Sequence, residues 1–167
     1  MRSTRSRLRT FDYLGKYRYF LTFCTHGRRK LFVSPSVVEP ALQQILQSAS
    51  EHDFAIPAYV FMPDHVHLLV DGLAESSDLK AFLKLAKQKS GYQFKRDCGR
   101  PLWQPSYYDR VLRDDESSLS VMWYILSNPV RAKLVAQCED YPFLGSTTHT
   151  IGEIRDAWTD HEQAWRP

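Results

Sequence analysis

Two histidines separated by one residue, His65 and His67, are the side chains in this sequence best placed to hold a metal ion. They follow Pro63 in an apolar, partly β-branched run over residues 61–70, a pattern that predicts a strand. Because side chains alternate faces along a strand, both imidazoles point to one side and can bind one cation. A histidine in a half-buried strand is more often a hydrogen-bonded structural residue, so a third ligand and a reactive group are needed.

Tyr124 and Asn128 are the candidates for that reactive group and third ligand. Acidic residues at 114–116 suit a helix start, and Pro129 marks the expected helix end. Side chains four residues apart lie on one helix face, so a phenol and an amide oxygen are presented together. That face differs from the apolar stripe formed by Leu119, Met122, Trp123 and Leu126.

These groups together could cleave a phosphodiester. A divalent cation held by two imidazoles and an amide oxygen polarises the phosphate, and a phenol near the cation attacks it. Oxygen and nitrogen ligands suit Mg²⁺ or Mn²⁺, although imidazoles also accept Zn²⁺, Co²⁺ or Ni²⁺. The chain has nine tyrosines, and others, including Tyr92, Tyr107 and Tyr108, could stack on a base or pack in the core.

The same residues belong to a longer set of ordered motifs, at 18–22, 62–67, 102–104, 108–113 and 124–130. With these motifs the sequence resembles the single-tyrosine HUH transposases, and within them the REP-associated tyrosine transposases. The resemblance covers most of residues 17–144. No single motif is specific, but the ordered set is.

The resemblance implies an enzyme that cuts and rejoins single-stranded DNA through a covalent 5′-phosphotyrosine. It implies that Tyr124 is the nucleophile, that His65 and His67 bind a divalent metal, Mg²⁺ or Mn²⁺, and that Asn128 is the third ligand. Many relatives outside the REP-associated branch have glutamine at this third place. The implied substrates are imperfect palindromic DNA hairpins, and the implied protein is a monomer that uses Tyr124 in cis.

Positive charge is concentrated in two blocks. Residues 1–30 contain nine Lys or Arg and one Asp, and residues 78–100 contain seven and two. In the first block, Arg2, Arg5, Arg7 and Arg9 alternate with polar residues and form either a DNA-binding arm or a merely solvated terminus. In the second, helical spacing gathers Lys80, Lys84, Lys87 and Lys95 beside an apolar stripe, which predicts either a DNA track or a solvated helix face.

Composition predicts one folded domain without a membrane segment. The chain has 167 residues, 43% of them hydrophobic, and lacks both an 18-residue apolar run and a signal-peptide pattern. Its three cysteines are widely spaced, which favours reduced thiols in a cytoplasm over a disulfide framework. The DNA binding that the resemblance implies would bring the protein to the nucleoid. We divide it into a basic arm (1–16), a catalytic domain (17–145) and a C-terminal tail (146–167).

The order of predicted elements is strand, helix, two strands, helix, strand, helix. This order predicts an α+β ferredoxin-like sandwich with an antiparallel sheet. The resemblance to the HUH transposases implies that the histidines lie on a central strand and that helices cover the opposite face. The expected strands are residues 17–25, 55–61, 65–70 and 109–112, and the expected helices are 36–52, 79–95, 115–128 and a short one from 151.

Two other classes of function fit the residues. One is a metal-dependent hydrolase that uses His65, His67 and Asp71, with Tyr124 only structural. The other is a ferredoxin-like module that binds nucleic acid without catalysis. A covalent DNA adduct distinguishes the transposase from both.

Overall fold

The computed structural model describes residues 11–113 and 116–164. Within these residues, five strands form one antiparallel sheet in the order β4-β1-β3-β2-β5. An antiparallel sheet with helices packed on it confirms the predicted α+β sandwich. Strand β3, which carries both histidines, lies at the centre of the sheet, as predicted. The strands are β1 (Arg18–Thr25), β2 (Phe54–Met62), β3 (His65–Gly72), β4 (Trp103–Val111) and β5 (Leu144–Gly145).

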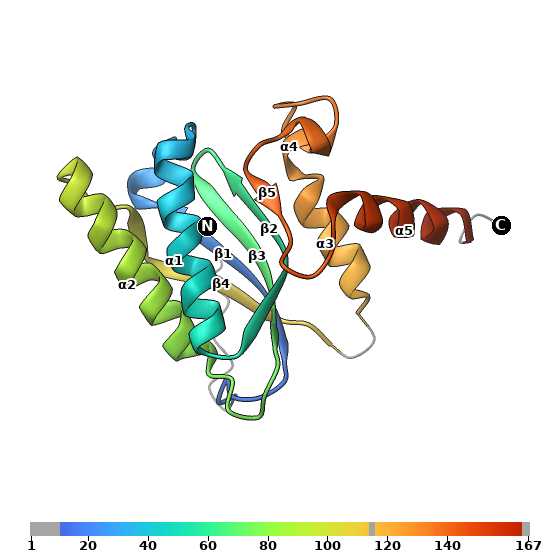
Figure 1. The fold of residues 1–167 in the computed structure, drawn as a ribbon, viewed down its shortest axis with the longest axis horizontal. Helices are drawn as coiled ribbons and strands as arrows, with labels where there is room; N and C mark the ends of the chain where they lie inside the picture. Colours follow the sequence, from blue (N-terminus) through green and yellow to red (C-terminus); the bar gives the residue numbers. More distant parts are fainter. Residues whose placement is uncertain (1–10, 114–115, 165–167) are drawn as a thin grey trace, which may run out of the picture.

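Helices lie on both sides of this sheet (Figure 1). One side carries α1 (Pro35–Glu51) and α2 (Leu79–Cys98). The other carries α3 (Ser118–Leu126), α4 (Asn128–Arg131) and α5 (Ile151–Ala164). Two short 3₁₀ turns, η1 (His26–Arg28) and η2 (Cys138–Asp140), complete the described elements.

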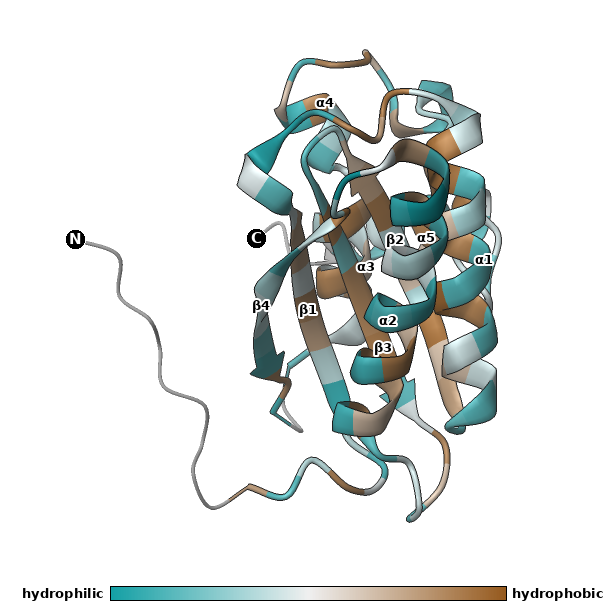
Figure 2. Cartoon of the chain, turned by 90° about the vertical axis from the view of Figure 1, so that its left-hand side faces the viewer, coloured by the Kyte–Doolittle hydropathy of each residue, from teal (hydrophilic) through white to brown (hydrophobic). Residues whose placement is uncertain are grey.

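Strand alternation decides which residues of β3 face each helix layer. Val66, Leu68 and Val70 are fully buried in the core beneath α1 and α2. His65 and His67 point to the opposite face, as the period of two requires. Figure 2 shows β1, β2 and β3 mostly in brown and the edge strand β4 largely in teal, so the apolar residues are concentrated in the central strands.

The second core fastens α3 to the histidine face. Its apolar side, Val121, Met122, Ile125 and Leu126, packs with Ala58, Val60 and Leu69 of the sheet. The C-terminal tail contributes too, since Ile154 is buried in this core and Trp158 stacks on Trp123 at 6.2 Å between ring centroids. The tail therefore packs on the helix that carries Tyr124.

Arg18, at the start of β1, forms hydrogen bonds with residues on both sides of the start of α3. Its guanidinium donates to the Ser118 hydroxyl at 2.6 Å and to the carbonyls of Glu116 and Arg113 at 3.1 and 2.8 Å. Ser117 caps the helix by accepting a hydrogen bond from the Ser120 amide at 3.3 Å. These contacts fix where the helix begins, and hence where Tyr124 lies.

Several predicted boundaries were wrong. The strand predicted over 109–112 runs from Trp103 to Val111 and includes Pro105, which an edge strand tolerates because one side needs no ladder bonds. The helix predicted over 115–128 begins at Ser118, ends at Leu126, and is followed after Ser127 by the separate turn α4.

The predicted N-terminal arm, residues 1–16, is described only in part by the structure. Arg2, Arg5, Arg7 and Arg9 lie outside the described residues. Tyr13, which the sequence placed in the arm, is buried in the core against Phe11 and Tyr19, and the Leu79 amide donates to its carbonyl. Packing of the chain on the sheet thus begins before residue 17.

In the described part of the chain, none of the helices has the length and apolar character needed to cross a membrane. The three cysteines, Cys24, Cys98 and Cys138, are free thiols, as predicted.

Candidate active site

The two imidazoles of β3 face each other. The Nε2 atoms of His65 and His67 are 3.1 Å apart, and the rings meet nearly edge to face at 4.7 Å between centroids. Both side chains are partly buried, with His65 only 18% exposed. Two nitrogens at this separation either share a proton or, as two lone pairs, bind one cation between them.

Neighbouring groups hold the outer nitrogens of both rings. The Asp64 carboxylate accepts a hydrogen bond from His65 Nδ1 at 2.7 Å, and His67 Nδ1 lies 2.8 Å from the Thr22 hydroxyl. A carboxylate only accepts, so the proton of neutral His65 is on Nδ1 and its Nε2 lone pair is free. Partners of this kind orient metal-binding histidines in proteins.

Electrostatics keep His67 in its neutral, ligating form. Burial, followed by the neighbouring charges of His65, Arg131 and Arg28, lowers the pKa of His67 to about 3. Arg28 lies close because its Nε pairs with Asp64 Oδ2 at 3.1 Å. At neutral pH His67 is therefore a neutral imidazole, in which one ring nitrogen has a lone pair that can bind a cation.

We predict that Thr22→Val weakens metal binding without unfolding the protein. The change removes the hydroxyl beside His67 Nδ1 but keeps a side chain of similar shape, so the ring loses its orienting partner. Loss of such a partner lowers metal affinity by about 10- to 100-fold. Calorimetric titration with Mn²⁺ measures the effect, and Thr22→Ser, which keeps the hydroxyl, should bind like wild type. Equal affinity in Thr22→Val would show that the hydroxyl is not needed.

Tyr124 lies on the same side of the sheet and is accessible. Its side chain is 46% exposed, and Phe20 connects it to the histidines. The Phe20 ring stacks on His67 at 5.2 Å and meets Tyr124 edge-on at 6.0 Å. The guanidinium of Arg131 covers the other part of the phenol ring, 3.9 Å from its centroid.

Asn128 is fixed by contacts within its own helical turn. Its Nδ2 donates to the carbonyls of Tyr124 and Ile125 at 2.9 and 3.3 Å, and its Oδ1 accepts from Arg131 at 3.1 Å. The amide thus lies against the main chain of Tyr124, and Arg131 contacts both the amide oxygen and the phenol ring, although Ser127 interrupts the helix between the two residues. The amide oxygen has a second lone pair available for a ligand.

The residues at this site could bind a metal ion if a neutral ligand completed the histidine pair. Among the described residues, His, Cys, Asp and Glu form no cluster of three or more that could hold a metal. The His65 and His67 pair therefore needs a neutral ligand, and an amide such as Asn128, water or a phosphate oxygen would serve.

The lysines of the second basic block do not lie beside this site. They belong to α2, whose apolar residues pack in the core on the opposite face of the sheet. Lys87 donates to the carbonyls of Gln104, Pro105 and Ser106, and Lys80 lies over the Tyr13 ring at 5.0 Å. Lys84 and Lys95 are exposed.

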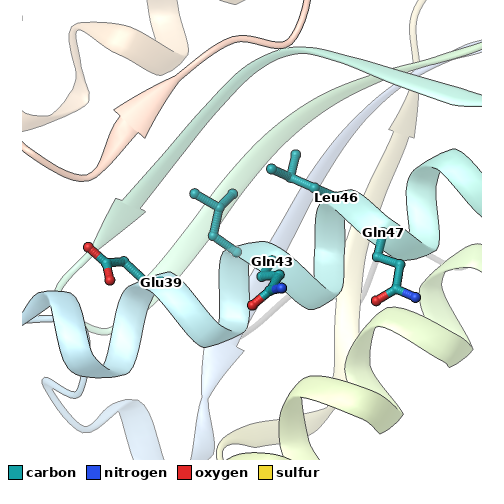
Figure 3. A pocket seen from close by; sticks show the side chains of 5 residues that line it. Glu39, Gln43, Leu46 and Gln47 are labelled. Atoms are coloured by element: carbon teal, nitrogen blue, oxygen red, sulfur yellow. The ribbon is translucent and has the colours of Figure 1, made fainter.

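Surface hollows also lie on the far side from the histidines. One is lined by Glu39, Leu42, Gln43, Leu46 and Gln47 of α1, whose side chains are drawn in Figure 3. A second shares Leu46 and extends to Phe54 and Leu73. Neither contains a residue of the candidate site.

Comparison with known proteins assigns the fold and the site to a class. A family model described as an IS200-like transposase matches residues 14–128, which include both histidines, Tyr124 and Asn128. The matched range spans strands β1 to β4 and helix α3. The chain belongs to the IS200-like transposase family.

Its similarities lie within the REP-associated branch. It is 26% identical over 132 residues to the REP-associated tyrosine transposase of Escherichia coli K12, with 78% of this chain and 76% of that protein covered. A solved structure of a REP-associated tyrosine transposase bound to a REP hairpin matches with a TM-score of 0.68 and 25% identity, covering 83% and 81%. A Deinococcus radiodurans structure, 21% identical with a TM-score of 0.51 over 77% and 92%, shows the fold alone.

Sequence reasoning missed the residues that surround the predicted ones. Asp64 could have been found, because a carboxylate directly before the first histidine is a common orienting partner. Thr22 and Phe20 required the β1–β3 register, which pairs Thr22 with His67. Pro129 indicates that the helix ends near Ser127, but the contact of Arg131 with Tyr124 depends on how the chain continues after that break.

Proposed function

We propose that this transposase cleaves and rejoins single-stranded DNA next to hairpins, using Tyr124 as nucleophile and His65, His67 and Asn128 as metal ligands. The observation that carries the proposal is the pair of Nε2 atoms 3.1 Å apart. The Nδ1 atom of each ring is hydrogen-bonded, to Asp64 in His65 and to Thr22 in His67. Phe20 connects this pair to an exposed phenol. The resemblance to a hairpin-bound transposase supports the choice of substrate.

The reaction exchanges one phosphodiester for another. The Tyr124 oxygen forms a bond to phosphorus, the bond from phosphorus to the 3′ oxygen breaks, and the phenol proton leaves the tyrosine while the 3′ oxygen gains one. A bound Mg²⁺ or Mn²⁺ would polarise the phosphate. Attack by a 3′-hydroxyl on the phosphotyrosine reverses the step, so no nucleotide cofactor is needed.

Arg131 connects the nucleophile with the proposed amide ligand. One guanidinium covers the Tyr124 ring and donates to Asn128 Oδ1, so it restrains both side chains at once. Its charge is one of the causes that lower the pKa of His67, so Arg131 acts on both parts of the proposed site. A positive group there favours binding of an anionic substrate.

We expect Arg131→Ala to lower the rate of adduct formation by about 10- to 100-fold at saturating DNA, the usual effect of removing a group that orients a ligand. Single-turnover cleavage of a labelled strand measures it. Lys133→Asn is the matched control, because it also removes a positive charge and asparagine tolerates the left-handed backbone at that position. Equal rates in Arg131→Ala and wild type would exclude this role.

The direct test of the proposal uses end-labelled DNA hairpins with single-stranded flanks. Incubation with Mg²⁺ or Mn²⁺ should yield a protein–DNA adduct that resists denaturation, together with a free 3′-hydroxyl fragment. Cleavage without an adduct would support the hydrolase instead, and binding without cleavage would support the non-catalytic module.

The structure gives one reason to prefer the transposase over the hydrolase that uses Asp71. Asp71 shares the histidine face of β3 but lies four residues beyond His67, about 13 Å along a strand. Its carboxyl is largely buried, and burial raises its pKa. It therefore lies too far away to bind the same cation.

DNA binding by the basic blocks remains a proposal. A strand at the histidines does not meet Lys80, Lys84, Lys87 or Lys95, because the sheet separates them. To reach α2, DNA would have to pass round the β4 edge. We also propose that the protein acts as a monomer, in the cytoplasm, on nucleoid DNA.

A further inference from the structure

On the histidine face, α3 leaves the edge next to β4 exposed. That helix packs on β2 and β3, the side of the sheet away from β4. Toward the β4 edge, Ser106 and Tyr108 are exposed, and Tyr108 is 40% accessible. The exposed part of this face thus includes Ser106 and Tyr108 of β4, next to the partly buried Thr22 of β1.

Strand register places Tyr108 in line with the catalytic candidates. Tyr108 pairs with Thr22 on β1, and Thr22 pairs with His67 on β3. Directly paired residues point to the same face, and neighbouring strands are about 4.8 Å apart. The Tyr108 ring therefore begins about 10 Å from the histidine strand, within reach of the nucleotide next to a phosphate held there.

The Tyr108 side chain lies at the surface and does not pack in the α1–α2 core. Its neighbour Tyr107 points to the other face and packs on the α1–α2 core. Tyr108 instead touches Phe20 edge-on at 6.4 Å, which supports one side of the ring. The same Phe20 contacts His67 and Tyr124, so one buried aromatic positions all three side chains.

The charge around this surface suits a nucleic-acid strand. Arg28 pairs with Asp64, which holds His65, and Arg131 covers the Tyr124 ring, so two guanidinium groups lie at this site. Proteins that bind single strands combine positive groups for the backbone with aromatic rings on which bases stack. A flat exposed phenol beside a phosphate site has that arrangement.

We propose that Tyr108 is a stacking platform for a base of single-stranded DNA that crosses the β1–β4 half of the sheet. The strand occupies the uncovered face, with its scissile phosphate at His65 and His67 and an adjacent base on the Tyr108 ring. This inference rests on the proposed function, because that function places DNA at the histidines.

The test measures binding in a protein that cannot cleave. In a Tyr124→Phe background, Tyr108→Ala should weaken binding of a hairpin with a single-stranded flank by about 5- to 150-fold, the range for one stacked base. Tyr108→Phe should bind normally, because the ring is kept. Tyr92→Ala is the matched control, since Tyr92 is 70% exposed but lies on α2, across the sheet.

A fluorescent base reports stacking directly. With 2-aminopurine at successive flank positions, one position should be quenched on binding, and Tyr108→Ala should abolish that quenching while Tyr92→Ala preserves it. Tyr108→Leu, which fills the same surface without a π face, should behave like Tyr108→Ala and separates stacking from loss of packing. Affinity and quenching in Tyr108→Ala equal to those of Tyr92→Ala would overturn the proposal.

The two proposals fail in different ways. A wild-type protein that forms no adduct, but whose strand binding depends on the Tyr108 ring, would disprove the tyrosine nuclease and support the platform. An adduct in wild type with no effect of Tyr108→Ala would disprove the platform alone.

Discussion

Replacing Tyr124 with phenylalanine should abolish the covalent adduct and reduce strand cleavage by at least about 10³-fold, while hairpin affinity stays within about twofold of wild type. The substitution removes one oxygen and keeps the ring. Phe20 and Arg131 both contact that ring, so their packing survives the change. Denaturing electrophoresis of labelled DNA after incubation with metal measures the adduct, and equilibrium binding measures affinity.

Tyr92→Phe serves as the control, because it removes the same atom from an exposed tyrosine on the opposite side of the sheet. It should leave both measurements unchanged. An adduct that persists in Tyr124→Phe would assign the nucleophile to another tyrosine. Tyr108, which also contacts Phe20, would then be the next to test.

The faces of the histidine strand could be predicted from the sequence, because the alternation of side chains along a strand is a short-range pattern. Strand alternation alone separates Val66, Leu68 and Val70 from His65 and His67, and the structure places the two sets on opposite faces. The central position of the histidine strand was predicted from the family resemblance. Local sequence does not determine which strands become neighbours.

The site as a whole could not be predicted, because its supporting residues come from distant parts of the chain. Thr22 reaches His67 only through the pairing of β1 with β3, across 45 residues of sequence. Arg131 covers Tyr124 because Ser127 ends α3 and lets a second turn begin. Both depend on tertiary geometry that periodicity does not encode.

For the lysines of α2, the local pattern was predicted correctly but the position of the helix relative to the histidines was not. Their helical spacing was read correctly, since α2 buries Leu79, Phe82 and Ala86 as expected. A helical pattern indicates which side of a helix meets the core but not which face of the sheet the helix covers. The sheet therefore came to lie between these lysines and the histidines.

Loss of the histidine pair should remove both metal binding and cleavage. We expect His65→Gln and His67→Gln each to lower cleavage by about 10³-fold or more, because a cation that polarises the phosphate contributes several kcal/mol. Glutamine retains much of the volume of the ring, which limits the loss of packing where His67 stacks on Phe20. A chelator should have the same effect on wild type, and added Mn²⁺ should restore wild type alone.

Metal affinity separates this role from a merely structural one. Calorimetric titration of the double variant should show no binding in the range where wild type saturates, because the two Nε2 atoms act together on one ion. His149→Gln is the matched control, since His149 is exposed in the loop before α5. If the double variant bound Mn²⁺ as tightly as wild type, the metal would lie elsewhere. The arrangement of Asp64 and Thr22 behind the rings would then be only a means of burying two histidines in a sheet.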